Sequence, residues 1–379
     1  MKRVAILGST GSVGVSALNL IAAAPDCFEV VGLAAGHNYQ RLSEQISRFR
    51  PRLASVCAGV EECVALNAGV ELASGADGLC RVATMPEADV VLIAVAGAGS
   101  LAPTLCALRA GKTVALASKE ALVMAGELVM ATAARHGATL LPVDSEHSGV
   151  FQAMHGRTAA DVRRIILPAS GGPFFRADPA TLDSVTPEQA LNHPTWSMGK
   201  KISIDSATLM NKALELIEAH WLFGVDPSRI DVLIHPQSAV HALVELNDGS
   251  VIAQLSAADM RLPILHALCW PERPDLGLPR LDLAAIGRLD FLPVDPGRFP
   301  APDLARRALV LGGTAPAALA AADEVLVAAF LDRRIPFTAI VPLAEKVLAA
   351  HQPRPVDSLE AALAADREAR ETVGKLLVD

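Results

Sequence analysis

The sequence predicts an α/β protein with a parallel sheet near the N-terminus, a central α+β region and a C-terminal bundle of helices. Three observations support this class. Apolar strand-like runs alternate with helical segments over the first ~145 residues, which is the pattern of βαβ units. Strand-like runs separated by polar loops begin at about residue 163, without that alternation. After residue 303 only helical spacing remains.

Composition limits the classes of function. The 379 residues are 51% hydrophobic and only 4% aromatic, which fits large α/β cores divided among several domains. A net charge of −8 gives no electrostatic reason to expect nucleic acid or an anionic membrane as a partner. The six cysteines form no CxxC pair, so we expect reduced thiols and no zinc site. No apolar run of about 18 residues and no signal peptide are evident, and we expect a cytoplasmic protein without a membrane span.

The N-terminal sheet is predicted from continuous apolar strands, which are typical of a parallel sheet covered by helices on both faces. The strands are VAILG, FEVVGLAA, DVVLIAVAG, KTVALAS and ATLLPVD. After the first strand comes Gly8-Ser9-Thr10-Gly11-Ser12-Val13-Gly14, where glycines let backbone N–H groups approach a pyrophosphate at a helix N-terminus. We therefore predict a Rossmann-like dinucleotide-binding domain; a plain turn is the alternative.

The end of the second strand indicates which dinucleotide is bound. That strand ends in Gly36-His37-Asn38, with no carboxylate to bind a ribose 2′-hydroxyl, and Arg41 follows. NADPH is therefore favoured over NADH.

The central region is predicted to contain the strands RRIILPAS, KKISID, RIDVLIH, AVHALVEL and SVIAQLS. A proline-rich stretch resembles an extended linker, and four helical segments follow it. We predict domains at 1–144 (NADPH binding), 145–269 (catalysis, metal binding and dimerisation), 270–303 (linker) and 304–379 (helical).

Acidic side chains point to a metal site. Asp144 and Glu146 follow a strand at the carboxyl edge of the sheet, where ligands of open α/β folds bind. With Glu215 they would suit Mg²⁺ or Mn²⁺; a solvated loop is the alternative. Lys119-Glu120 follows another strand at the same edge. These two residues could contact a ligand or form an ordinary ion pair at the start of a helix.

A helix near residue 209 is predicted to carry Asn211, Lys212 and Glu215 within one turn. They could face water, but Ser206 and other polar residues just upstream crowd the helix start and favour an anion such as phosphate. Ser170-Gly171-Gly172-Pro173 could take an anion or be only a turn. The loop 193–199 exposes Trp196 and Met198 unless it closes over a ligand, so we predict a lid, with packing on the core as the alternative.

Six segments together resemble the 1-deoxy-D-xylulose 5-phosphate reductoisomerase family, over nearly the whole chain. They are LGSTGSVG, ASKEALV, PVDSEHSGVFQ, ASGGPF, HPTWSMGKKISIDSATLMNKALELIEAHWLF and HPQSAVHALVE. The resemblance implies an NADPH- and metal-dependent homodimer. Such an enzyme rearranges 1-deoxy-D-xylulose 5-phosphate and reduces the product to 2-C-methyl-D-erythritol 4-phosphate, in non-mevalonate isoprenoid synthesis.

The same resemblance implies roles for individual residues. The cofactor would contact Thr10, Gly11, Ser12, Val13, Gly36, His37, Asn38, Ser118, Glu120 and Gly199. The metal would be bound by Asp144, Glu146 and Glu215. The sugar phosphate would contact Lys119, Ser145, Glu146, Ser170, His193, Ser206, Asn211, Lys212 and Glu215, with Lys119, Asp144, Glu146, Glu215 and His193 in catalysis. Trp196 and Met198 would form the lid. Two positions depart from the family pattern, Ser118 in place of Asn and His37 in place of Lys or a small polar residue.

Two other functions fit parts of the sequence. An NADPH-dependent semialdehyde dehydrogenase shares the glycine loop but needs a nucleophilic cysteine, and Cys106 and Cys269 lie in apolar helical segments. A non-catalytic NADPH-binding module would explain the first domain and leave the acids and the lid unexplained.

Overall fold

The computed structural model describes residues 1–58, 63, 69–194, 196 and 198–378 and divides the chain into two compact units. Unit 1 contains residues 1–121, 129–148 and 259–279. Unit 2 contains residues 122–128, 149–258 and 280–379. Both units are therefore assembled from segments that are separated in the sequence. Among the described residues, none of the helices has the length and apolar character that a membrane crossing requires.

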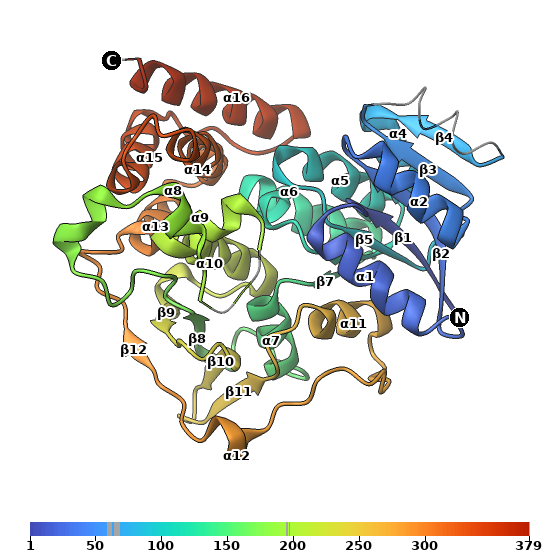
Figure 1. Ribbon diagram of the computed structural model, residues 1–379, viewed down its shortest axis with the longest axis horizontal. Coiled ribbons are helices and arrows are strands. Elements are labelled where there is room, and N and C mark those ends of the chain that lie inside the picture. The colour runs from blue at the N-terminus through green and yellow to red at the C-terminus, as the bar shows by residue number, and fades with distance from the viewer. Residues whose placement is uncertain (59–62, 64–68, 195, 197, 379) are drawn as a thin grey trace. The chain divides into compact units, whose positions relative to one another are not determined.

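Unit 1 is built on a seven-stranded sheet in the order β4-β3-β2-β1-β5-β6-β7, whose strands all pair in parallel (Figure 1). The strands are β1 (Lys2–Leu7), β2 (Phe28–Ala35), β3 (Leu53–Val56), β4 (Glu71–Ser74), β5 (Val90–Ile93), β6 (Thr113–Leu116) and β7 (Thr139–Pro142). The strand order reverses direction between β1 and β5. This is the topological switch point, where open α/β sheets bind their ligands.

Helices connect these strands. They are α1 (Ser12–Ala23), α2 (Tyr39–Phe49), α4 (Gly75–Ala83), α5 (Leu101–Arg109) and α6 (Lys119–His136). After β7, α7 (Ser145–Ala153) leads into unit 2, and α11 (Arg261–Cys269) returns to unit 1 later in the chain. The sequence accounts for several boundaries: Asn38 caps α2 through its side chain, and Gly137 ends α6 in the left-handed conformation. Ala125 has φ −150° and kinks α6 within the stretch that belongs to unit 2.

Unit 2 contains a mixed five-stranded sheet in the order β11-β10-β8-β9-β12. The strands are β8 (Val162–Ala169), β9 (Ile230–Ile234), β10 (Val240–Leu246), β11 (Val251–Leu255) and β12 (Leu292–Pro293). β8 pairs with β9 in parallel, whereas the other neighbours are antiparallel. One face of this sheet packs in a core that includes Val150, Ile165 and Leu216.

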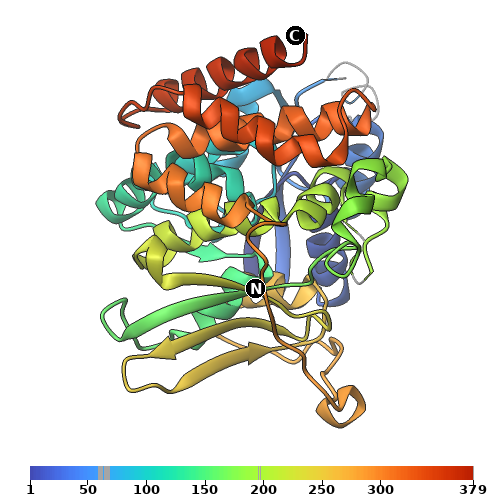
Figure 2. The same ribbon diagram turned by 90° about the vertical axis from the view of Figure 1, so that its left-hand side faces the viewer.

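The helices of unit 2 are α8 (Pro187–Leu191), α9 (Lys200–Thr208), α10 (Met210–Phe223), α12 (Leu283–Ile286), α13 (Ala301–Leu311), α14 (Ala315–Leu331), α15 (Ile340–Ala350) and α16 (Leu359–Leu376). Figure 2 shows α10 next to the sheet and the C-terminal helices stacked beyond it. α14 lies at the centre of this layer, and its buried alanines share a core with Ile204, Ala207 and Met210. Small side chains let these helices approach closely.

Two details of the sequence prediction are wrong. KKISID is not a strand but the beginning of α9. Its alternating isoleucines, Ile202 and Ile204, suggested a two-residue period. In the structure Lys201 pairs with Asp205 across one helical turn, and of the two isoleucines only Ile204 is fully buried. As a consequence, Ser206 lies near the end of α9 rather than at the start of α10. The short strands β3 and β4 were not expected either. The predicted parallel and mixed sheets and the four C-terminal helices are confirmed.

Candidate active site

The glycine loop of unit 1 forms a tight turn between β1 and α1. Gly8 has φ +81°, and a Cβ added there would lie 2.0 Å from the carbonyl oxygen of Ala94. A Cβ on Gly14 would lie 2.3 Å from the carbonyl oxygen of Gly8, so both positions need glycine. Thr10 and Gly11 precede the first helical turn, which contains Ser12 and Val13 and whose N–H groups can hold an anion.

Two buried hydrogen bonds between Ser9 and Gln45 support this loop. The Ser9 hydroxyl donates to the Gln45 side chain at 2.7 Å, and the Gln45 amide donates back to the Ser9 carbonyl at 2.8 Å. Gln45 was missed in the sequence because nothing in its surroundings distinguishes it from an ordinary helical glutamine.

The end of β2 carries no acidic side chain at Gly36, His37 or Asn38, and all three residues are exposed. The Asn38 side chain accepts the backbone N–H of Arg41 at 3.0 Å. The Arg41 guanidinium donates to the Thr10 carbonyl at 3.3 Å, which puts a positive charge beside the glycine loop. The arrangement suits a dinucleotide with a 2′-phosphate.

The strands β6 and β7 are neighbours, and the residues that follow them meet at one edge of the sheet. The buried Ser118 donates to the carbonyl of Val95 at 2.6 Å. Lys119, at the start of α6, lies 2.8 Å from the Asp144 carboxylate, measured from Nζ to Oδ2, with both side chains largely buried. Glu120 is half-buried in the same first turn.

The segment Asp144-Ser145-Glu146 leads from β7 into α7. The Asp144 carbonyl accepts the N–H of Ser148 at 2.8 Å, and the Ser145 hydroxyl donates to the Glu146 carboxylate at 2.5 Å. Asp144 and Glu146 are both half-buried rather than solvated. Two carboxylates this close in the chain repel each other unless a proton or a cation lies nearby.

In unit 2, three predicted residues from different elements come together. Ser170 follows β8, His193 follows α8, and Ser206 lies in the last turn of α9. His193 Nε2 lies 2.8 Å from the Ser170 hydroxyl and 3.1 Å from the Ser206 hydroxyl. Burial lowers the pKa of His193, so its ring is neutral at pH 7.

The lid segment starts from this histidine. The Trp196 N–H donates to His193 Nδ1 at 2.9 Å, so the ring proton is assigned to Nε2, which can donate to a hydroxyl. The Trp196 ring contacts the His241 ring edge-on at a centroid distance of 6.5 Å. Trp196 and Met198 are half-buried and Gly199 is exposed at the N-terminus of α9. Thr195 and Ser197 of the predicted lid lie outside the described residues.

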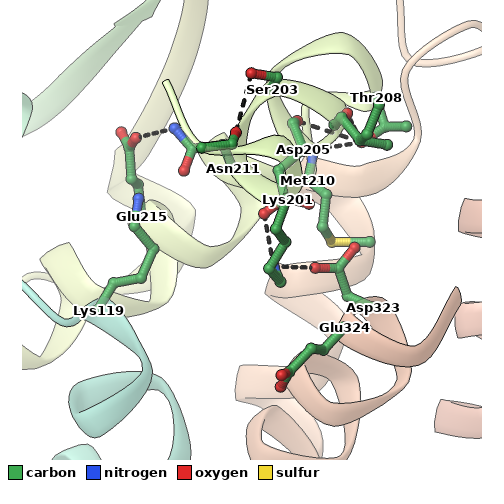
Figure 3. Close-up of polar contacts among 12 residues, drawn as sticks. Lys119, Lys201, Ser203, Asp205, Thr208, Met210, Asn211, Glu215, Asp323 and Glu324 are labelled. Atoms are coloured by element: carbon green, nitrogen blue, oxygen red, sulfur yellow. Dashed lines mark hydrogen bonds and ion pairs between the residues drawn. The ribbon is translucent and has the colours of Figure 1, made fainter. Parts of the chain in front are cut away.

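The first turns of α10 contain the predicted trio, and the idea that this stripe faces water is wrong. Glu215 is fully buried and Lys212 is 4% exposed. The Asn211 amide donates to Glu215 Oε1 at 2.5 Å (Figure 3). The Lys212 ammonium lies 2.6 Å from Glu215 Oε2. The carboxylate is therefore held by two side chains. Glu218, one turn later, is also fully buried.

Within the described part of the chain, no histidine is among the groups that shift the pKa of Cys106 or Cys269, the two candidate nucleophiles. Cys269 is buried in α11, and burial raises its pKa to about 11. Cys106 lies in α5, where a hydrogen bond with Cys80 lowers its pKa to about 7. The charged groups that act on it are Arg109, which lowers this pKa, and Asp77, which raises it.

Comparison with known proteins identifies the family. A profile described as 1-deoxy-D-xylulose 5-phosphate reductoisomerase matches residues 4–126, and two profiles for C-terminal domains of that enzyme match residues 140–223 and 255–372. A 1-deoxy-D-xylulose 5-phosphate reductoisomerase from Anaeromyxobacter sp. (strain K) is 57% identical over 99% of this chain and 98% of its own. One from Methylococcus capsulatus is 50% identical over 100% and 99%.

Solved structures agree with these matches. The reductoisomerase from Zymomonas mobilis in complex with NADPH has a TM-score of 0.93 and 44% identity, covering 99% of each chain. A second structure, a complex with NADPH, fosmidomycin and magnesium, has a TM-score of 0.92 and 39% identity, covering 100% of this chain and 98% of the other. The chain thus belongs to the 1-deoxy-D-xylulose 5-phosphate reductoisomerase family of NADPH-dependent oxidoreductases.

Proposed function

We propose that this chain converts 1-deoxy-D-xylulose 5-phosphate to 2-C-methyl-D-erythritol 4-phosphate, with NADPH as reductant and a divalent metal ion. Membership of the family over nearly the full length of the chain carries this proposal. The reaction would be a step of non-mevalonate isoprenoid synthesis. By the same family resemblance we propose a homodimer. From the sequence pattern we propose a cytoplasmic location and functional domains at 1–144, 145–269, 270–303 and 304–379, which differ from the two compact units of the fold.

The cofactor part of the proposal rests on unit 1. We assign the pyrophosphate to Thr10, Gly11, Ser12 and Val13, because the N-terminus of α1 presents unpaired N–H groups at the switch point of the sheet. The 2′-phosphate would lie by Gly36, His37 and Asn38, close to Arg41. Ser118, Glu120 and Gly199 complete the proposed contacts. A related solved structure contains NADPH.

The metal part rests on the chemistry of the donors. Asp144, Glu146 and Glu215 offer only carboxylate oxygens, which suit Mg²⁺ or Mn²⁺. The helix that begins beside Asp144 continues into the core of unit 2, where its Val150 shares a cluster with Leu216, the neighbour of Glu215. A related solved structure contains magnesium. When bound, the ion would polarise the ketone and the adjacent hydroxyl of the substrate.

The chain's own residues would bind and orient the sugar phosphate. Ser170, His193 and Ser206 already form a polar cluster, and with Asn211 and Lys212 they would hold the phosphate. Binding energy at this end can orient the reacting end of the substrate. Lys119 and Ser145 would contact the reacting oxygens, where the Lys119 ammonium adds positive charge.

The lid would complete the site. Trp196 and Met198 present large apolar side chains in the segment between His193 and α9. Closure over the substrate would exclude water from the aldehyde intermediate before its reduction.

NADPH oxidation provides the test. Absorbance at 340 nm should fall when 1-deoxy-D-xylulose 5-phosphate and Mg²⁺ or Mn²⁺ are added, should stop with EDTA, and should resume when the metal is restored. Fosmidomycin should inhibit the reaction. Oxidation with a semialdehyde alone would favour the dehydrogenase alternative, and NADPH binding without any turnover would favour the non-catalytic module.

A further inference from the structure

A buried cluster of charges lies within the helical layer of unit 2. The Lys201 ammonium, in the first turn of α9, lies 2.6 Å from Asp205 Oδ2 on the same helix and 2.6 Å from Asp323 Oδ2 on α14. Figure 3 shows the lysine between the two carboxylates. Asp205 and Asp323 are 3% and 0% exposed, whereas the Lys201 side chain is partly exposed. We call these three residues the α9–α14 bridge.

The charges of the bridge are strongly coupled. Burial alone would lower the pKa of Lys201, but the charges of Asp205 and then Asp323 outweigh it and raise this pKa above its ordinary value. The second carboxylate oxygen of Asp323, Oδ1, is buried and has no hydrogen-bond partner within the part of the chain that is described. An unsatisfied buried oxygen is costly, so the bridge is not the most stabilising way to fill this space.

The residues around the α9–α14 bridge are apolar, which also indicates that the bridge is not the most stabilising way to fill this space. Ile204, Ala207 and Met210 pack against alanines of α14 in one continuous apolar core. Replacing a buried ion pair by apolar side chains is often neutral or stabilising, because desolvation offsets the attraction between the charges. In some proteins a buried polar contact instead fixes the register between two helices.

The position of α9 matters for the proposed substrate site. The helix begins directly after the lid, and the Ser203 hydroxyl fastens its first turn to the Gly199 carbonyl at 3.0 Å. Asp205 is followed by Ser206, whose hydroxyl contacts His193. The Lys201 ammonium therefore ties the helix that carries Ser206 and the end of the lid to α14.

We propose that Lys201 and Asp323 are positioning residues that hold α9 in register on α14, so that Ser206 meets the phosphate of the substrate. This inference rests on the proposed function. No direct contact of either residue with the substrate is implied.

The test compares Lys201→Met and Lys201→Arg with the wild-type enzyme. KM for 1-deoxy-D-xylulose 5-phosphate and the Kd for inorganic phosphate, measured by calorimetry, should both rise about tenfold or more in Lys201→Met, because small misplacements of a binding group are costly. The Kd for NADPH should stay within about twofold, since every proposed cofactor contact except Gly199, the N-cap of α9, lies in unit 1. Lys201→Arg should recover most of the phosphate affinity. If Lys201→Met does not fold, Asp323→Asn, which keeps the shape of the side chain, should move KM and the phosphate Kd in the same direction.

Arg370→Met is the matched control. Arg370 of α16 lies 2.6 Å from Glu324, the residue after Asp323 on α14, and 2.8 Å from Asp366 of its own helix. This variant should lower thermal stability without changing KM. The inference is overturned if phosphate affinity is unchanged in Lys201→Met and Asp323→Asn, or if Arg370→Met weakens it equally. A wild-type enzyme that does not turn over the sugar phosphate would contradict the proposed function, while the phosphate Kd would still decide the role of the bridge.

Discussion

Replacing Glu215 with Gln removes the charge at the centre of the proposed site while keeping the size of the side chain. In the structure, this fully buried carboxylate lies 2.6 Å from the Lys212 ammonium, which is 4% exposed. At that separation and an effective dielectric constant near 20, the Coulomb attraction is about 6 kcal/mol. Experiments that break buried pairs find a net loss of roughly 3–5 kcal/mol. The Gln oxygen can still accept one hydrogen bond, so we expect about 3 kcal/mol, the lower end.

The expected loss can be measured by urea unfolding of the metal-free protein, where a lost metal ligand does not add to the effect. Turnover should collapse as well, because a proposed metal ligand is lost, while the Kd for NADPH should stay within about twofold. Glu371→Gln, an exposed position on α16, serves as the control and should change neither quantity.

The reasoning is refuted if Glu215→Gln unfolds at the same urea concentration as the wild type and retains turnover. An equal loss of turnover and NADPH affinity would also contradict it, because the residue would then act on the cofactor and not on the metal or the substrate.

Three further predictions concern other parts of the chain. Gly14→Ala places a Cβ 2.3 Å from the Gly8 carbonyl oxygen, so the free energy of unfolding should fall by roughly 1–3 kcal/mol and KM for NADPH should rise; unchanged values would refute the close approach. Burial lowers the pKa of His193 from 6.5, so its contribution to stability is present above pH 6.5 and lost as pH falls through the lowered pKa. Urea unfolding between about pH 5 and pH 8 should therefore show less acid sensitivity in His193→Gln than in the wild type. Cys106→Ser and Cys269→Ser should keep kcat/KM within about twofold. Loss of turnover in either variant would support the dehydrogenase alternative, which needs a cysteine nucleophile.

The sequence was most informative where local pattern and tertiary packing agree. The apolar strands and the glycine loop of unit 1 were predictable because a parallel sheet buries both faces and a tight turn needs glycine. The spacing of Asn211, Lys212 and Glu215 likewise predicted that they meet on one helical face. Their burial was not predictable, because it depends on what packs against that face.

Other features depend on distant contacts. Ile202 and Ile204 alternate like a strand, yet the segment is helical, since packing on α14 overrides a short two-residue period. The spacing of Lys201 and Asp205 was a helical signal that could have corrected this prediction. Asp323 was a second signal, because with Glu324 it forms a pair of acids within an otherwise apolar helical run. Its partner lies 122 residues away, and no local pattern identifies such a pair.

The hydrogen bonds on α10 also link the binding of the metal to the binding of the phosphate. We assign Lys212 and Asn211 to the phosphate and Glu215 to the metal. In the structure both Lys212 and Asn211 donate to the Glu215 carboxylate. A divalent ion drawn to that carboxylate would compete with these donors and make them available to an anion. Cation and phosphate should then bind with positive cooperativity, and thermodynamic linkage requires each to tighten the other by the same factor.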